Sequence, residues 1–153
     1  MDQNAPQGRI VVGVDGSEPS KRALEWARFV AQSSGAAIDA VMAWHLPIYA
    51  GDGGWPGDWD PEADCKTALH QAVEDVLGAT PGLAVRELVY EGNTAQVLLE
   101  ASKDAQVLVV GSRGHGGFTG LLLGSVSATC AEHARCPVLV IHGETPAPSV
   151  DNQ

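Results

Sequence analysis

Short apolar runs alternate with longer amphipathic stretches along the whole chain. This alternation is typical of repeated β/α units arranged around a parallel sheet. Five apolar runs predict strands, which span Arg9 to Val14, Ala37 to Trp44, Val85 to Tyr90, Gln106 to Val110 and Val138 to His142. The pattern therefore predicts a single α/β domain built on a five-stranded parallel sheet.

The amphipathic stretches between these runs predict four helices. The first runs from about Pro19 to Ser33, with Ser17 as its N-cap. Its predicted inward stripe is formed by Ala23, Trp26, Ala27 and Val30. The other three run from about Pro61 to Leu77, from near Thr94, and from near Ser125 to a point before Pro137.

Three segments depart from this rhythm and set the expected domain limits. Residues 1–8 and 144–153 are polar or contain proline, so we expect flexible tails around a domain that covers residues 9–143. Residues 46–60 predict a long loop rich in glycine, proline and tryptophan. Trp55 or Trp59 of this loop would be able to cover a base bound nearby, and the alternative is a solvated insertion.

The fourth predicted strand leads into a glycine-rich segment, Gly111 to Ser125, that precedes the fourth helix. A buried strand followed by such a loop and a helix N-terminus offers free backbone N–H groups and a positive dipole end to an anion. Glycine tolerates positive φ and lets ligand oxygens approach the backbone. Arg113 and Ser125 add side-chain donors. Phosphate is the expected ligand, and the alternative is a loop that only turns the chain.

Two common phosphate-binding motifs are excluded. The P-loop pattern needs a lysine before its final serine or threonine, but Leu123 and Gly124 precede Ser125, and residues 111–125 contain no lysine. A dinucleotide fingerprint that starts at Gly114 would need glycine at the position of Thr119. The segment therefore predicts neither a Walker-type nucleotidase nor a Rossmann dehydrogenase.

Composition narrows the classes of partner. Lys and Arg total 9 against 19 Asp and Glu, and the net charge of −10 argues against binding to nucleic acid or to an anionic membrane. No stretch resembles a secretory signal or a membrane span, so we expect a cytoplasmic protein. The three cysteines and five histidines lack the spacing of a disulfide framework or a metal site, so no metal site is expected.

The glycine pattern resembles a known family. Gly111-x2-Gly114-x9-Gly124-Ser125 matches the G-2x-G-9x-G-[S/T] signature of the ATP-binding branch of the universal stress protein family. The resemblance extends from Ile10 to Ser17 at one end of the chain and from Cys136 to Val140 at the other. It implies a Rossmann-like open sheet of order 3-2-1-4-5 with helices on both faces. Strands one and four are then neighbours, and ligands bind at such a switch point.

The resemblance also implies an ATP site, with Mg²⁺, and assigns residues to it. The matching positions are Gly13, Val14 and Asp15 near adenine and ribose, Ala43 at the adenine edge, Gly111 by the ribose, Arg113 nearby, and Gly114, Gly124, Ser125, Val126 and Ser127 around the phosphates. A carboxylate in direct contact with a triphosphate is repelled, so we expect Asp15 to face the base or sugar, or to meet phosphate through a metal.

Two functions from different classes follow, and a third reading remains. The first is a nucleotide-dependent regulatory module in a stress response, since we find neither a P-loop lysine nor a base poised to activate water. The second is a slow ATPase or autophosphorylating enzyme, with Ser112, Thr119, Ser125 or Ser127 as acceptor. The third is a purely structural dimer. The resemblance implies a homodimer in which two copies of the fifth strand, Val138 to Ile141, pair antiparallel.

Overall fold

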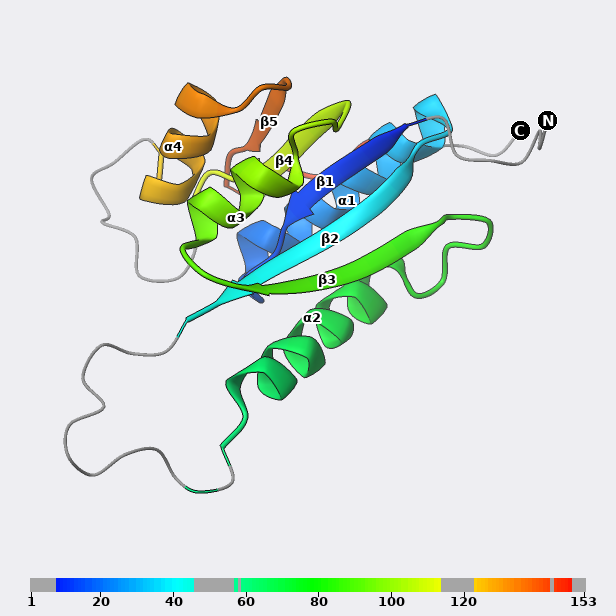
Figure 1. Cartoon of the computed structure of the whole chain (residues 1–153). Coiled ribbons are helices and arrows are strands. Elements are labelled where there is room, and N and C mark those ends of the chain that lie inside the picture. The colour runs from blue at the N-terminus through cyan, green and yellow to red at the C-terminus, as the bar shows by residue number, and fades with distance from the viewer. Residues whose placement is uncertain (1–7, 46–56, 58, 114–122, 144, 150–153) are drawn as a thin grey trace.

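The computed structural model describes residues 8–45, 57, 59–113, 123–143 and 145–149. Its five strands form one parallel sheet in the order β3-β2-β1-β4-β5 (Figure 1). The strands are β1 (Arg9–Gly13), β2 (Ala37–Trp44), β3 (Val85–Glu91), β4 (Val107–Gly111) and β5 (Val138–Ile141). The predicted α/β fold and its strand order are confirmed.

Four helices cover the two faces of the sheet. They are α1 (Glu18–Ser34), α2 (Pro61–Leu77), α3 (Thr94–Ala101) and α4 (Ser125–His133). Helices α1 and α2 lie on one face, and α3 and α4 lie on the other (Figure 1). Each face has its own apolar cluster, because side chains alternate between the two faces along every strand. Among the described residues, no helix has the length and apolar character needed to cross a membrane.

The predicted inward stripe of α1 was only partly right. Ala23 and Ala27 are buried as expected, and so are Leu24 and Ala31, which the prediction omitted. Trp26 and Val30 lie at the rim of the cluster, partly buried. The Trp26 indole N–H instead donates to the Thr145 carbonyl at 3.0 Å. The buried face is therefore rotated toward the side on which α1 meets α2 and the sheet.

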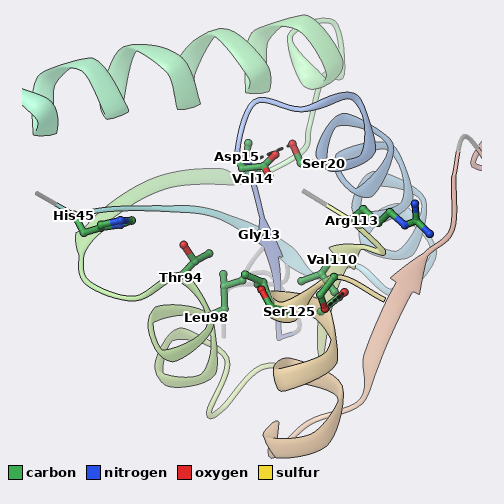
Figure 2. A pocket seen from close by; sticks show the side chains of 14 residues that line it. Gly13, Val14, Asp15, Ser20, His45, Thr94, Leu98, Val110, Arg113 and Ser125 are labelled. Carbon is green, nitrogen blue, oxygen red and sulfur yellow. Dashed lines mark hydrogen bonds between the residues drawn. The ribbon is translucent and has the colours of Figure 1, made fainter. Parts of the chain in front are cut away.

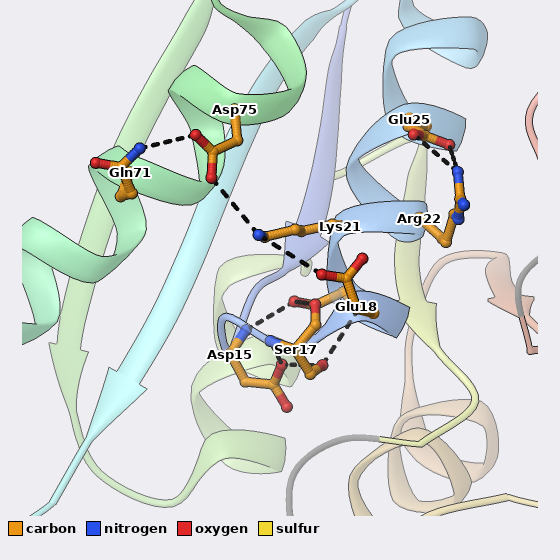
Figure 3. Close-up of polar contacts among 9 residues, drawn as sticks. Asp15, Ser17, Glu18, Lys21, Arg22, Glu25, Gln71 and Asp75 are labelled. Carbon is orange, nitrogen blue, oxygen red and sulfur yellow. Dashed lines mark hydrogen bonds and ion pairs between the residues drawn. The ribbon is translucent and has the colours of Figure 1, made fainter.

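Local signals explain where the helices begin. Ser17, Asp60 and Asn93 are the N-caps of α1, α2 and α3, and each side chain accepts a hydrogen bond from a backbone N–H in the first turn. Helix α1 ends at Gly35, whose φ of +77° lies in the left-handed region that glycine adopts without strain. Lys21 of α1 and Asp75 of α2 form an ion pair at 3.5 Å between the two helices (Figure 3).

One charged group is buried in the sheet, near its amino end. Asp39 of β2 is 3% exposed, and it accepts hydrogen bonds from Arg9 of β1 at 2.9 Å and from Arg86 of β3 at 2.8 Å. Burial raises the pKa of Asp39 above its ordinary value, although the Arg9 guanidinium opposes that rise. The three charges therefore join neighbouring strands at the end of the sheet opposite to its carboxyl edge.

His70 of α2 provides a pH-dependent contact with β3. Its Nδ1 lies 3.1 Å from both carboxylate oxygens of Glu87, and the hydrogen bond and charge of Glu87 raise the pKa of His70 above 6.5. Because folding raises this pKa, protonated His70 stabilises the fold fully at pH values below its unfolded-state pKa, and the contribution is lost as pH rises through the folded-state pKa.

We predict that Glu87→Gln lowers the His70 pKa in an NMR titration. The stability difference between wild type and variant should disappear at alkaline pH, and a constant difference would contradict the prediction.

Candidate functional site

The site lies where β1 and β4 end side by side. After β1 the chain continues into α1 on one face of the sheet, whereas after β4 it continues into α4 on the other face (Figure 1). In open parallel sheets, this reversal of direction leaves a crevice outside the carboxyl ends of the strands. A cleft of about 370 Å³ occupies this place, and this volume is in the range of small-molecule sites.

Most of the predicted site residues line this one cleft. They are Gly13, Val14, Asp15, Gly111, Arg113, Gly124, Ser125, Val126 and Ser127 (Figure 2). Ala43 lies in β2, opposite Tyr90 of β3, and does not line the cleft. Gly114 is outside the described residues, as are Trp55 and Thr119.

The turn after β1 holds the Asp15 carboxylate at the start of α1. Its Oδ1 accepts hydrogen bonds from the Ser17 backbone N–H at 2.9 Å and from the Ser17 hydroxyl (Figure 3). The Asp15 N–H in turn lies 3.3 Å from the Ser20 Oγ. Gly16, at φ +82°, gives the turn a conformation that other residues rarely adopt. The negative charge at this end of the cleft is therefore placed by local hydrogen bonds.

On the other side of the cleft, hydrogen bonds connect the end of β4 with the start of α4. The Ser112 N–H donates to the Ile141 carbonyl of β5 at 2.8 Å. The Ser112 carbonyl accepts hydrogen bonds from the Gly124 N–H at 2.6 Å and from the Ser127 hydroxyl at 2.9 Å. These bonds bring the two ends of the intervening segment together, so α4 begins beside the end of β4.

The N-terminus of α4 has no side-chain cap. Its N-cap is Gly124, whereas the other three helices have capping side chains. The Ala128 N–H donates to the Gly124 carbonyl at 2.9 Å, so the N–H groups of Ser125, Val126 and Ser127 come before the helical ladder. All three residues line the cleft, as does Arg113. N–H groups that precede the helical ladder, the helix dipole and a guanidinium together favour an anion at this end.

Glycine allows close packing at the two strand ends. A Cβ on Gly111 would lie 3.0 Å from the Cβ of Pro19 in α1 and 3.1 Å from its backbone carbon and oxygen. A Cβ on Gly13 would lie 2.8 Å from the Cδ1 of Leu98 in α3. At Gly111 and Gly13, helices α1 and α3 therefore lie closer to the strand ends than a side chain at these two positions would permit.

Five lining residues were not predicted. They are Ser20, His45, Thr94, Leu98 and Val110. Figure 2 shows His45 and Thr94 on the side of the cleft away from Arg113. A signal for His45 was present in the sequence, because it follows the second strand directly at the same edge of the sheet. Among the described residues, no group of three or more His, Cys, Asp or Glu side chains is arranged to hold a metal ion.

The fold and the cleft place this protein in the doubly wound, Rossmann-like class of α/β proteins. A family model described as the universal stress protein family matches residues 7–142. The chain belongs to the universal stress protein family, as the resemblance predicted.

Relatives of known sequence support this assignment. A universal stress protein of Mycolicibacterium smegmatis is 37% identical over 157 aligned residues, which cover 96% of this chain and 52% of the relative. A universal stress protein of Mycobacterium tuberculosis is 35% identical over 136 residues, which cover 88% of this chain and 45% of the relative. The chain thus spans about half the length of these relatives.

Solved structures of the family show the same fold. A universal stress protein in complex with cAMP has a TM-score of 0.67 and 30% identity, with 90% of this chain and 98% of that chain covered. An Arabidopsis thaliana family protein with AMP bound has a TM-score of 0.60 and 25% identity, with 89% and 91% covered. UspA of Lactobacillus plantarum has a TM-score of 0.73 at 22% identity, with 90% and 99% covered, and supports the fold alone.

We predict that Gly111→Ala destabilises the protein by about 1–3 kcal/mol, because the new Cβ meets the backbone of Pro19, which cannot move aside easily. Urea unfolding of the variant and of wild type measures this difference. Gly57→Ala is the matched control, since a Cβ there meets no atom of the described residues within 4 Å. Equal stability of Gly111→Ala and wild type would show that α1 adjusts without cost.

Proposed function

We propose that the cleft binds an adenine nucleotide, ATP with Mg²⁺, and that this protein acts as a nucleotide-dependent regulatory module in a stress response. The observation that carries the proposal is the glycine-capped start of α4, which lines the cleft together with Arg113. Two family structures, in complex with cAMP and with AMP, support an adenine nucleotide as the ligand.

The charges of the cleft favour one orientation of the nucleotide. The phosphates would bind at the N–H groups of Ser125 to Ser127 and at Arg113, because backbone donors at a helix N-terminus and a guanidinium attract anions. The base and sugar would lie toward Asp15, because a carboxylate repels phosphate but accepts hydrogen bonds from hydroxyl or amino groups. This orientation separates the two ligand ends according to the two sides of the cleft.

A magnesium ion that arrives with the phosphates would be held mainly by the ligand and by water. Mg²⁺ prefers oxygen ligands and is often held by one or two carboxylates together with substrate phosphates. Asp15 is the one carboxylate among the described residues of the cleft, and its Oδ1 already accepts two hydrogen bonds from Ser17. Phosphate oxygens and water would therefore supply most of the ligands of the bound magnesium ion.

A regulatory role follows if the nucleotide binds one state of the protein more tightly than another. A ligand shifts a conformational equilibrium only by its difference in affinity for the two states. The backbone of Ser112 is hydrogen-bonded through its carbonyl to the start of α4 at the cleft and through its N–H to β5 at the sheet edge. We therefore expect the nucleotide to influence the edge formed by β5.

We also propose that two copies of the chain pair through this edge. β5 is an outer strand of the sheet, and Val138, Leu139 and Val140 are each only partly buried. The carbonyl of Pro137 accepts a hydrogen bond from Leu108 of β4, and that of Ile141 accepts one from Ser112, directly after β4. Since backbone groups alternate in direction along a strand, those of Val138 and Val140 point away from the sheet and are suited to pairing with a partner.

Calorimetry with ATP and Mg²⁺ tests the cleft through a matched pair of variants. Gly124→Asp and Gly124→Asn add side chains of nearly equal size at the helix cap, but only the first adds a negative charge. We predict that the aspartate variant binds ATP at least about tenfold more weakly than the asparagine variant, because its carboxylate repels phosphate. Circular dichroism controls for folding. Equal affinity of the two variants would move the phosphate site away from α4.

Sedimentation tests the pairing of β5. Val140→Pro removes an outward backbone N–H, so we predict that it raises the dimer dissociation constant at least about tenfold. Both copies lose this donor in a two-fold interface. The monomer's unfolding transition provides the control for its stability. A monomeric wild type at micromolar concentrations, or an unchanged constant in the variant, would rule out this interface.

A further inference from the structure

Ser127 lines the cleft, yet its hydroxyl points into the protein. The residue is 2% exposed. Its Oγ lies 2.9 Å from the Ser112 carbonyl oxygen and 3.1 Å from the Gly124 carbonyl oxygen. A serine hydroxyl has a single proton, which these two carbonyls share. A ligand in the cleft can therefore reach the backbone of Ser127 but not the proton of its side chain.

The Ser112 carbonyl is the point on which the first turn of α4 converges. It accepts the Gly124 N–H at 2.6 Å as well as the Ser127 hydroxyl, and Ser112 is itself 6% exposed. The N–H of the same residue donates to Ile141 of β5. The backbone of Ser112 is therefore fixed by the start of the helix through its carbonyl oxygen and by the neighbouring strand through its N–H.

This arrangement matters for an anion in two ways. A carbonyl oxygen carries partial negative charge, and one without donors beside the N-terminus of α4 would oppose a phosphate. Two donors from α4 neutralise much of that charge. They also hold the helix start in register with the end of β4, so that the N–H groups of Ser125 and Val126 keep fixed positions at the cleft.

We infer that Ser127 is a positioning residue for the phosphate groups: its hydroxyl holds the Ser112 carbonyl and the first turn of α4 in place, and this hydroxyl does not bind the ligand. This inference rests on the proposed nucleotide site. The family resemblance placed Ser127 around the phosphates. In the inferred role, Ser127 would reach phosphate through its backbone N–H alone. The phosphate-dependent part of the affinity depends on this hydroxyl, and the part due to base and sugar does not.

The test compares ATP with adenosine, each titrated by calorimetry with Mg²⁺ present, on wild type and Ser127→Ala. Loss of one hydrogen bond predicts an ATP affinity about three- to tenfold weaker in the variant, with adenosine affinity unchanged. Ser102→Ala is the matched control. Ser102 is 0% exposed and its hydroxyl bonds the Leu99 carbonyl at 3.3 Å at the far end of α3, so the ratio of the two affinities should stay at its wild-type value.

The possible results separate the two proposals. An unchanged ATP-to-adenosine ratio in folded Ser127→Ala, or an equal loss for both ligands, overturns the positioning role and leaves the nucleotide site standing. A wild type that binds no ATP overturns both.

Should Ser127→Ala fail to fold, amide hydrogen exchange in wild type decides. The Gly124 amide should be protected without ligand, and those of Ser125 and Val126 only with ATP. Equally fast exchange of all three without ATP overturns the inference.

Discussion

The pairing of β1 with β4 is the constraint on which the site depends. Ile10, Val11 and Val12 pair with Val107, Leu108 and Val109, and the centres of both strands are fully buried. Helix α1 follows β1 on one face, while α4 follows β4 on the other, so the two helices begin on opposite sides of the paired strand ends (Figure 1). Without this pairing, the turn at Asp15 and the start of α4 would not border one cleft.

Most of the fold could be predicted because its signals are local. Apolar runs mark the buried strands, and the capping residue Ser17 marks the start of α1 within a residue or two. The strand order needed the family resemblance, because periodicity does not specify which strands pair. The inward face of α1 was predicted only in part because contacts with α2 and the sheet, rather than its own spacing, decide how the helix is rotated.

The site shows the same division between local and distant information. The glycine pattern identified the start of α4, because a cap without a side chain is visible in the sequence. Thr94 and Leu98 were missed because α3 reaches the cleft by packing across β1 and β2, a contact between segments far apart in the chain. The direction of the Ser127 hydroxyl was also beyond the sequence, since the motif alone does not distinguish a ligand contact from an internal hydrogen bond.

An acidic protein can bind an acidic ligand if the attraction is local. The net charge of −10 repels a nucleotide at long range, but solvent and salt screen charges beyond about 8–10 Å. The backbone N–H groups of α4 act at hydrogen-bond distance and need no excess of basic residues. If the nucleotide complex and the dimer both form as proposed, the backbone of Ser112 joins the two regions they use. Any change that dimerisation makes in nucleotide affinity must then be matched by an equal change that the nucleotide makes in dimerisation.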